Sequence, residues 1–338
     1  MSLVAHVEVR ARDVNARIEV TSGDSLVLVG PNGSGKSTVV EAVAGVVPLD
    51  AGEIEVEGRP CRAHGRERSA RVALVPQDGA LLPHLSVLDN VAFGPRARGV
   101  RRENARAKAS DVLERLGAAH LTMRRPHELS GGEMRRAAIA RALALEPHVI
   151  LLDEPFAGLD VDVTAGIRAL VASLRSTTTM VLTTHDAADA VLLGDQVAVL
   201  EEGRVVESGT PGDVFTHPRT PFSARMAGRL LVTGAMTSGG LMPADGEPIP
   251  VSGDLGIGQQ GAIAPRPAEV RVQAVQEPRD ASCSWRVQPV TGIEPRTDTV
   301  RYYGGQLAAD VDPERAQALM SESALAFGIP HGVRAYRL

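Results

Sequence analysis

Aromatic residues and cysteines are both scarce in this chain. Among 338 residues there are one tryptophan, three tyrosines and five phenylalanines, and no aromatic residue precedes Phe93. The two cysteines, Cys61 and Cys283, lie far apart and do not have the spacing of metal ligands. They predict reduced thiols, as in a cytoplasmic protein.

Long apolar runs and an excess of positive charge are also missing. No uninterrupted apolar run approaches the ~18 residues that a membrane-spanning helix needs, and residues 1–10 lack the apolar core of a secretory signal. With 36 basic and 41 acidic residues the net charge is −5, which does not favour nucleic acid as the main partner. We expect a soluble chain of about two domains that reaches a membrane only through another subunit.

A glycine-rich stretch is the first strong signal in the sequence. It matches the pattern G-x-x-x-x-G-K-[ST] and comprises Gly30, Pro31, Asn32, Gly33, Ser34, Gly35, Lys36, Ser37 and Thr38. An apolar strand is expected before it at 25–29 and a helix after it at 37–47, which is the context that this motif requires. The stretch therefore predicts a phosphate-binding loop, and a chance glycine turn is the alternative.

The residue types of this loop suit a nucleotide and its metal ion. Gly30, Gly33 and Gly35 let the backbone fold tightly enough for successive N–H groups to converge on a β-phosphate. Lys36 adds positive charge at the β- and γ-phosphates, and the N-terminal end of the following helix adds more. The hydroxyl of Ser37 is suited to ligate Mg²⁺.

An acidic pair directly follows the apolar run at 149–152. Asp153 ends a strand expected inside a parallel sheet, where a carboxylate faces a bound phosphate and metal, and we expect it to hold Mg²⁺ through water. Glu154 is the candidate for polarising the attacking water. The alternative is a pair of solvated acids at a strand end.

A second motif lies just upstream of the acidic pair. After Leu129 it comprises Ser130, Gly131, Gly132 and Glu133. A Ser-Gly-Gly turn that opens a helix is another phosphate-binding end, and one subunit cannot easily aim both ends at one phosphate. We therefore expect two subunits facing head to tail with ATP between them.

These motifs, in this order, resemble those of the ATP-binding subunits of ABC transporters over residues 4–229. The resemblance implies that Ser130 and Gly132 contact the γ-phosphate bound by the opposite subunit. It also implies that Gln77 touches Mg²⁺ beside Ser37 and Asp153 and senses the membrane subunits. Two further roles follow from the resemblance: dimer coupling by Asp160 and contact with the γ-phosphate by His185. The expected catalytic residues are Glu154, His185 and Gln77.

The resemblance predicts an α/β fold in two domains. The first is a P-loop ABC ATPase domain at 1–229, with a helical subdomain at about 78–145. After residue 229 the composition changes, and short alternating segments with turns between them predict a small β-rich domain at 230–338. It resembles an oxyanion-binding, TOBE-like barrel, and a protein-binding or dimer-stabilising module is the alternative. A short helix is expected at Pro313, capped by Asp312.

Within the family the chain looks most like the ATPases of molybdate importers. This implies a homodimer under a multi-span permease, a solute-binding protein on the other side of the membrane, and a peripheral position at the cytoplasmic face. Importers of sulfate, iron or other small solutes are the alternatives. A soluble ABC ATPase acting on DNA or ribosomes is disfavoured, because neither a second ATPase domain nor a long coiled coil is apparent.

Three features depart from the family pattern. Glu133 and Met134 stand where glutamines are common, so contacts at the signature helix are expected to differ, and Gly158 stands where serine or alanine is usual. No aromatic residue precedes the glycine loop, where one usually stacks on adenine. Arg10 and Arg12 lie in that upstream segment, and either they are solvated surface residues or a guanidinium plane lies over the base.

Overall fold

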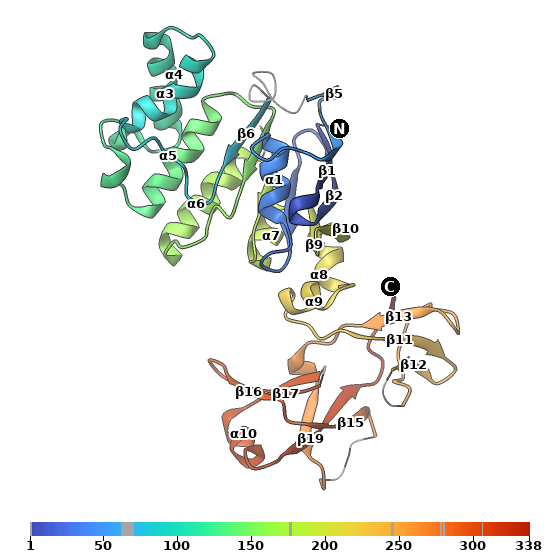
Figure 1. The fold of residues 1–338 in the computed structure, drawn as a ribbon. Helices are drawn as coiled ribbons and strands as arrows, with labels where there is room; N and C mark the ends of the chain where they lie inside the picture. Colours follow the sequence, from blue (N-terminus) through green and yellow to red (C-terminus); the bar gives the residue numbers. More distant parts are fainter. Residues whose placement is uncertain are drawn as a thin grey trace. The chain divides into compact units, whose positions relative to one another are not determined.

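The computed structural model describes residues 2–61, 71–175, 178–244, 247–277, 279, 281–305 and 307–338 (Figure 1). These residues form two compact units, Met1–Pro211 and Gly212–Leu338. The composition placed the domain change later, at residue 229. The segment between the two boundaries belongs with the second unit, where the hydroxyl of Tyr336 donates to the carbonyl of Pro218 at 2.7 Å.

A six-stranded sheet forms the centre of the first unit. Its strands lie in the order β10 (Arg204–Gly209), β9 (Gln196–Glu201), β3 (Ser25–Val29), β8 (Thr179–Thr183), β7 (Val149–Leu152) and β6 (Val72–Val75). All neighbours pair in parallel except β9 and β10, which form an antiparallel hairpin. Strands β3, β7 and β8 are buried along their whole length, as apolar strands of a parallel sheet should be.

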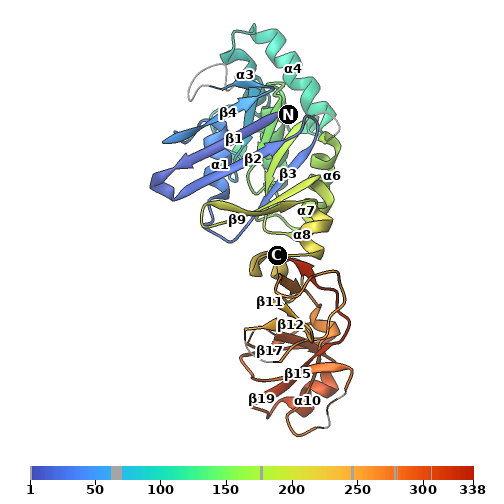
Figure 2. The same cartoon turned by 90° about the vertical axis from the view of Figure 1, so that its right-hand side faces the viewer.

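The first unit also contains a second sheet, which is antiparallel throughout (Figure 2). Its order is β2 (Val14–Val20), β1 (Leu3–Val9), β4 (Ala51–Val56) and β5 (Arg59–Pro60). In β1 every second residue is buried, which matches the alternation in its sequence. These residues join apolar side chains of helix α1 (Lys36–Ala44) and of the large sheet in one core. Helix α1 and the loop before it are thereby held between two sheets.

The helices of the first unit lie in two groups (Figure 1). Three of them fall within the region predicted to be helical and are α3 (Val87–Ala97), α4 (Arg102–Arg115) and α5 (Gly131–Leu143). Two more, α6 (Val161–Leu174) and α7 (Ala187–Leu193), follow strands β7 and β8. Among the described residues no helix is long and apolar enough to cross a membrane.

The second unit consists of short strands around its own apolar core. After α8 (Pro211–Thr216) and α9 (Pro221–Met226) come three small sheets. The first contains β12 (Gly240–Pro243), β11 (Val232–Thr237), β13 (Gln260–Ile263) and β20 (Tyr336–Arg337). The second contains β14 (Arg271–Ala274), β19 (Ala324–Pro330) and β15 (Cys283–Pro289), and the third contains β16 (Gly292–Pro295), β17 (Val300–Gly304) and β18 (Leu307–Val311). The β-rich character is as predicted, whereas closure into a barrel stays a prediction.

One helix of the second unit tests a local prediction. Helix α10 spans Pro313–Leu319, and the carboxylate of Asp312 accepts a hydrogen bond from the backbone N–H of Arg315 at 2.8 Å. Pro313 therefore occupies the first helical position and Asp312 caps the helix, as the sequence predicts.

Candidate nucleotide site

The glycine-rich stretch forms the turn from β3 to α1. Gly33 and Gly35 have φ angles of 80° and 100°, in the left-handed region that favours glycine. A Cβ atom at Gly35 would also lie 2.6 Å from a methyl carbon of Val14. Helix α1 begins at Lys36, directly after this turn. The backbone N–H groups at the helix start are therefore available to a phosphate, as the motif predicts.

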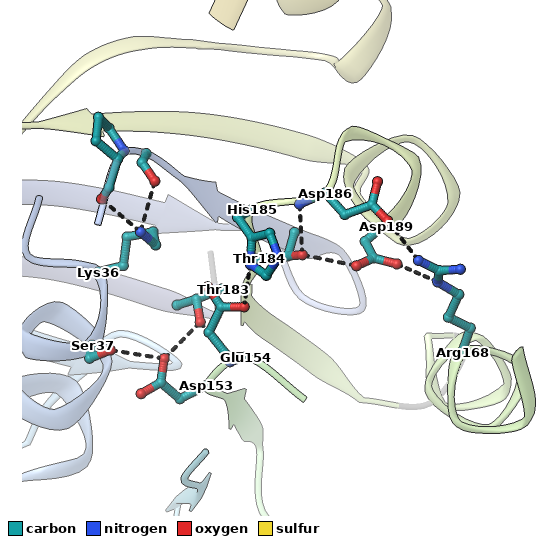
Figure 3. A network of polar contacts seen from close by, with 12 residues as sticks. Lys36, Ser37, Asp153, Glu154, Arg168, Thr183, Thr184, His185, Asp186 and Asp189 are labelled. Carbon is teal, nitrogen blue, oxygen red and sulfur yellow. Dashed lines mark hydrogen bonds and ion pairs between the residues drawn. The ribbon is translucent and has the colours of Figure 1, made fainter. Parts of the chain in front are cut away.

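Lys36 is buried within the loop itself. Its Nζ atom donates to the carbonyls of Gly30 at 2.8 Å and Pro31 at 3.0 Å (Figure 3). Burial lowers the pKa of the ammonium group, while the negative charges of Glu154 and Asp153 oppose this shift. A buried ammonium group near two carboxylates suits a ligand that is itself negatively charged and carries a metal ion.

Asp153 lies at the end of β7, beside the start of α1. The hydroxyl of Ser37 donates to Asp153 Oδ1 at 3.2 Å, and the hydroxyl of Thr183 donates to the same oxygen at 2.7 Å (Figure 3). Asp153 is only 6% exposed, so its orientation is set by these two hydroxyls. A carboxylate and a hydroxyl side by side are the oxygen donors that Mg²⁺ prefers.

Glu154, the residue after Asp153, contacts His185 through its side chain. Nδ1 of His185 lies 3.0 Å from Oε2 of Glu154, although 31 residues separate them in the chain (Figure 3). The backbone N–H of Glu154 donates to the hydroxyl of Thr183 at 2.8 Å. Glu154 has a φ angle of 44°, a strained conformation for a residue with a side chain. The fold thus holds its carboxylate beside the imidazole.

A pocket of about 570 Å³ joins half of the predicted site residues. Its walls are formed by the glycine loop, the start of α1 and side chains from four other segments. The lining residues are Arg12, Asn32, Gly33, Gly35, Lys36, Ser37, Thr38, Gln77, Glu154, Ala157 and His185. The structure therefore brings together the phosphate loop, the expected catalytic residues and one residue that the sequence left undecided, Arg12.

The signature residues do not line this pocket. Ser130 instead caps α5: its hydroxyl accepts from the N–H of Glu133 at 3.3 Å, and Glu133 accepts from the N–H of Ser130 at 2.9 Å. This reciprocal pair is a capping box. The hydrogen bond from the Ser130 backbone lowers the pKa of Glu133, and Arg124 adds an ion pair at 3.1 Å. Gln at this position could close the box equally, but without the charge.

Asp160 also lies outside the pocket, at the start of α6. Its carbonyl accepts from the N–H of Thr164 at 2.8 Å, and its side chain makes no capping hydrogen bond. Val161, the next residue, is 85% exposed. Within one subunit, neither the signature nor Asp160 belongs to the site formed around Lys36.

A further polar network was not predicted from the sequence. Arg168 on α6 forms ion pairs with Asp189 and, at 2.8 Å, with Asp186 (Figure 3). The hydroxyl of Thr184 donates to Asp189 at 2.9 Å. The hydrogen bond with Asp189 raises the pKa of Arg168. The network fixes the two residues that flank His185, and no spacing in the sequence signals it because Arg168 comes from another helix.

Comparison with known proteins reveals the relatives of the chain. The profile of the ABC transporter family matches residues 14–157. The iron import ATP-binding protein FbpC of Streptomyces coelicolor is 36% identical over 314 residues, which cover 90% of this chain and 84% of that protein. The chain belongs to the ABC transporter family. The molybdate/tungstate import ATP-binding protein WtpC of Pyrococcus abyssi is 34% identical over 300 residues, covering 87% of this chain and 84% of the relative.

Another relative of this ABC protein has a higher sequence identity to it, over a shorter aligned segment. The molybdenum import ATP-binding protein ModC of Mycobacterium tuberculosis (strain CDC 1551 / Oshkosh) is 44% identical over 236 residues. The match covers 67% of this chain and 64% of the relative, slightly less than two thirds of its length.

Solved structures agree with the predicted ABC ATPase fold. CbiO1 of Clostridium perfringens, described as part of the ABC transporter complex cbiONQ, aligns with a TM-score of 0.57 and 29% identity, covering 63% of this chain and 90% of that chain. The ATP-binding cassette MJ0796, described as dimeric and bound to ADP and Pi, aligns with a TM-score of 0.54 and 26% identity, covering 62% and 96% of the two chains. The α/β P-loop prediction is thus confirmed for the first unit.

Proposed function

We propose that this chain is the ATP-hydrolysing subunit of an importer for a molybdate-class oxyanion. The observation that carries the nucleotide chemistry is the single pocket that joins the glycine loop to Glu154, His185 and Gln77. Two relatives are named as import proteins for molybdenum or for molybdate and tungstate, which supports the solute. An iron importer is the second candidate, since a relative over 90% of this chain carries that name.

The proposed chemistry is phosphoryl transfer to water, which depends on positioning and on charge stabilisation. The loop amides and Lys36 bind the phosphates and balance their charge. Ser37, Asp153 and Gln77 are the residues that would hold Mg²⁺, which supplies further charge neutralisation when it is bound. Glu154 orients the attacking water and takes up its proton, and His185 contacts the γ-phosphate beside it.

The proposed enzyme works as a head-to-tail homodimer. Ser130, Gly131, Gly132 and Glu133 lie away from the pocket of their own subunit, which supports a role at the nucleotide of the other one. The start of α5 behind Ser130 offers backbone N–H groups to a γ-phosphate. Asp160, at the start of α6, is the proposed coupling residue between the two sites. A dimeric relative of similar fold supports this arrangement.

The dimer is proposed to act peripherally at the cytoplasmic face of the membrane. Its direct partners are multi-span permease subunits, and an extracytoplasmic solute-binding protein delivers the oxyanion to them. The segment around Gln77 is the proposed relay between nucleotide and permease. No nucleic acid takes part.

Solute uptake tests the function directly. In a strain that lacks this gene, the wild-type chain should restore accumulation of molybdate and tungstate at low external concentration, because ATP hydrolysis drives the import. Uptake would be measured by elemental analysis across molybdate, tungstate, sulfate and iron. Cells carrying the hydrolysis-deficient Glu154→Gln variant are the control. Restored uptake of iron alone would replace the oxyanion with the second candidate.

The second unit is proposed to be a small oxyanion-binding barrel of the TOBE-like type. A chain that ends at residue 229 should keep ATP binding, since its nucleotide pocket lies wholly in the first unit. It should lose the molybdate binding of the full chain. Calorimetry on both chains, with sulfate as the comparison, measures this. Absence of oxyanion heat in the full chain would leave the second unit as a partner-binding or dimer-stabilising module.

A further inference from the structure

The nucleotide pocket has little aromatic surface for a base. Among the described residues that line it, the only ring is the imidazole of His185, and this ring is engaged by Glu154 at 3.0 Å. A nucleotide bound by its phosphates at the glycine loop must still place its base against some other wall. Arg12 is the lining residue that comes from outside the loop and α1 and carries a planar, delocalised cation.

Arg12 is held in a defined position at this wall. Its Nη1 atom donates to Glu41 Oε2 at 2.7 Å and to the hydroxyl of Thr38 at 3.3 Å. Both partners lie on α1, in its first and second turns, so the guanidinium is tied to the helix that follows the phosphate loop. Among the described residues neither Nε nor Nη2 has a hydrogen-bond partner. The side chain is 49% exposed, which leaves surface that a base can cover.

Arg10 provides the contrast within the same short helical turn, Arg10–Arg12. Its side chain is 72% exposed and pairs with Glu8 at 2.9 Å. It does not line the nucleotide pocket, because it lies with Glu8 at a different hollow of the surface. Three arginines precede the glycine loop, Arg10, Arg12 and Arg17, and of these only Arg12 lines the pocket.

We propose that Arg12, fixed by Glu41, is the base-stacking residue of the nucleotide site. This inference rests on the proposed ATPase function. A guanidinium over a base makes a cation–π and stacking contact in place of an aromatic ring. Such a contact uses the face of the base rather than its edge, so it distinguishes adenine from guanine poorly. Arg12 therefore contributes affinity for the base without discriminating between the two purines.

The test compares ATP with inorganic tripolyphosphate, which carries the phosphates without a base. Arg12→Ala should weaken ATP binding about 3- to 10-fold and leave tripolyphosphate affinity unchanged. Arg12→Lys should weaken ATP binding as much, because the charge stays but the plane is lost. Arg12→Tyr should retain wild-type affinity for ATP. Arg10→Ala is the matched control and should change neither ligand.

The possible results distinguish a failure of the stacking inference from a failure of the proposed ATPase function. An equal loss for ATP and tripolyphosphate would assign Arg12 to the phosphates and overturn the stacking role, as would full ATP affinity in the Arg12→Ala variant. In the wild-type chain, ATP and GTP should compete within about tenfold of each other. A preference for ATP of more than about a hundredfold would require a contact to the adenine edge and also overturn the inference. If the wild-type chain binds neither ATP nor tripolyphosphate, the proposed function itself fails.

Discussion

Replacing Glu154 with glutamine is expected to lower ATP turnover by at least about 100-fold while nucleotide binding persists. Glutamine keeps the shape of the side chain but does not take up a proton from the attacking water. The phosphate loop and Lys36 are untouched, so ATP still binds, and the closed dimer should accumulate because hydrolysis no longer reopens it. Turnover and the mass of the dimer, measured together in the presence of ATP, give both results.

A matched control for this variant lies elsewhere in the chain. Glu146 also has a positive φ angle, 48°, against 44° at Glu154. Its side chain is 78% exposed and pairs with Lys108 away from the nucleotide pocket. Glu146→Gln should therefore leave turnover within about twofold of wild type, since surface pairs contribute little. Near-normal turnover in the Glu154→Gln variant would remove this residue from the role of base.

Removing the guanidinium of Arg168 is expected to lower the free energy of unfolding by about 3 kcal/mol. Asp189 is 1% exposed, and without Arg168 its buried charge would keep, among the described residues, only the side-chain hydrogen bond from Thr184. The guanidinium also lies 5.7 Å from the ring centroid of Phe156, which follows the acidic pair in the chain. Arg168→Ala should therefore loosen the two segments that carry Glu154 and His185. Denaturant unfolding of the purified chain measures the effect.

Two comparisons make the Arg168 result specific. Arg17→Ala removes a surface pair with Glu19 whose side chains are 67% and 34% exposed, and it should cost less than about 1 kcal/mol. The double change Arg168→Ala with Asp189→Asn removes both charges of the pair, so no unpaired charge stays buried, and it should recover part of the loss. An Arg168→Ala chain as stable as the Arg17→Ala chain would show that the buried network contributes nothing to the fold.

Local sequence patterns predict the bounds of two strands correctly but misplace the end of one helix. The strands at 25–29 and 149–152 were predicted with the bounds that β3 and β7 have. The helix expected at 37–47 ends earlier, at Ala44, because Gly45 adopts a φ angle of 80° and its N–H bonds back to Ala42. The apolar pair at 46–47 continued the helical pattern in the sequence and so masked this glycine cap.

The sequence by itself determined the elements that depend on neighbouring residues. The glycine loop between an apolar strand and a helix, the acidic pair at a strand end and the Asp312 cap each involve residues within a few positions, so their spacing alone predicts them. The tertiary structure alone decided the contacts between distant segments, because the sheet order and helix packing bring them together. It paired His185 with Glu154, tied Arg168 to Asp189, and placed Arg12 rather than Arg10 at the nucleotide pocket.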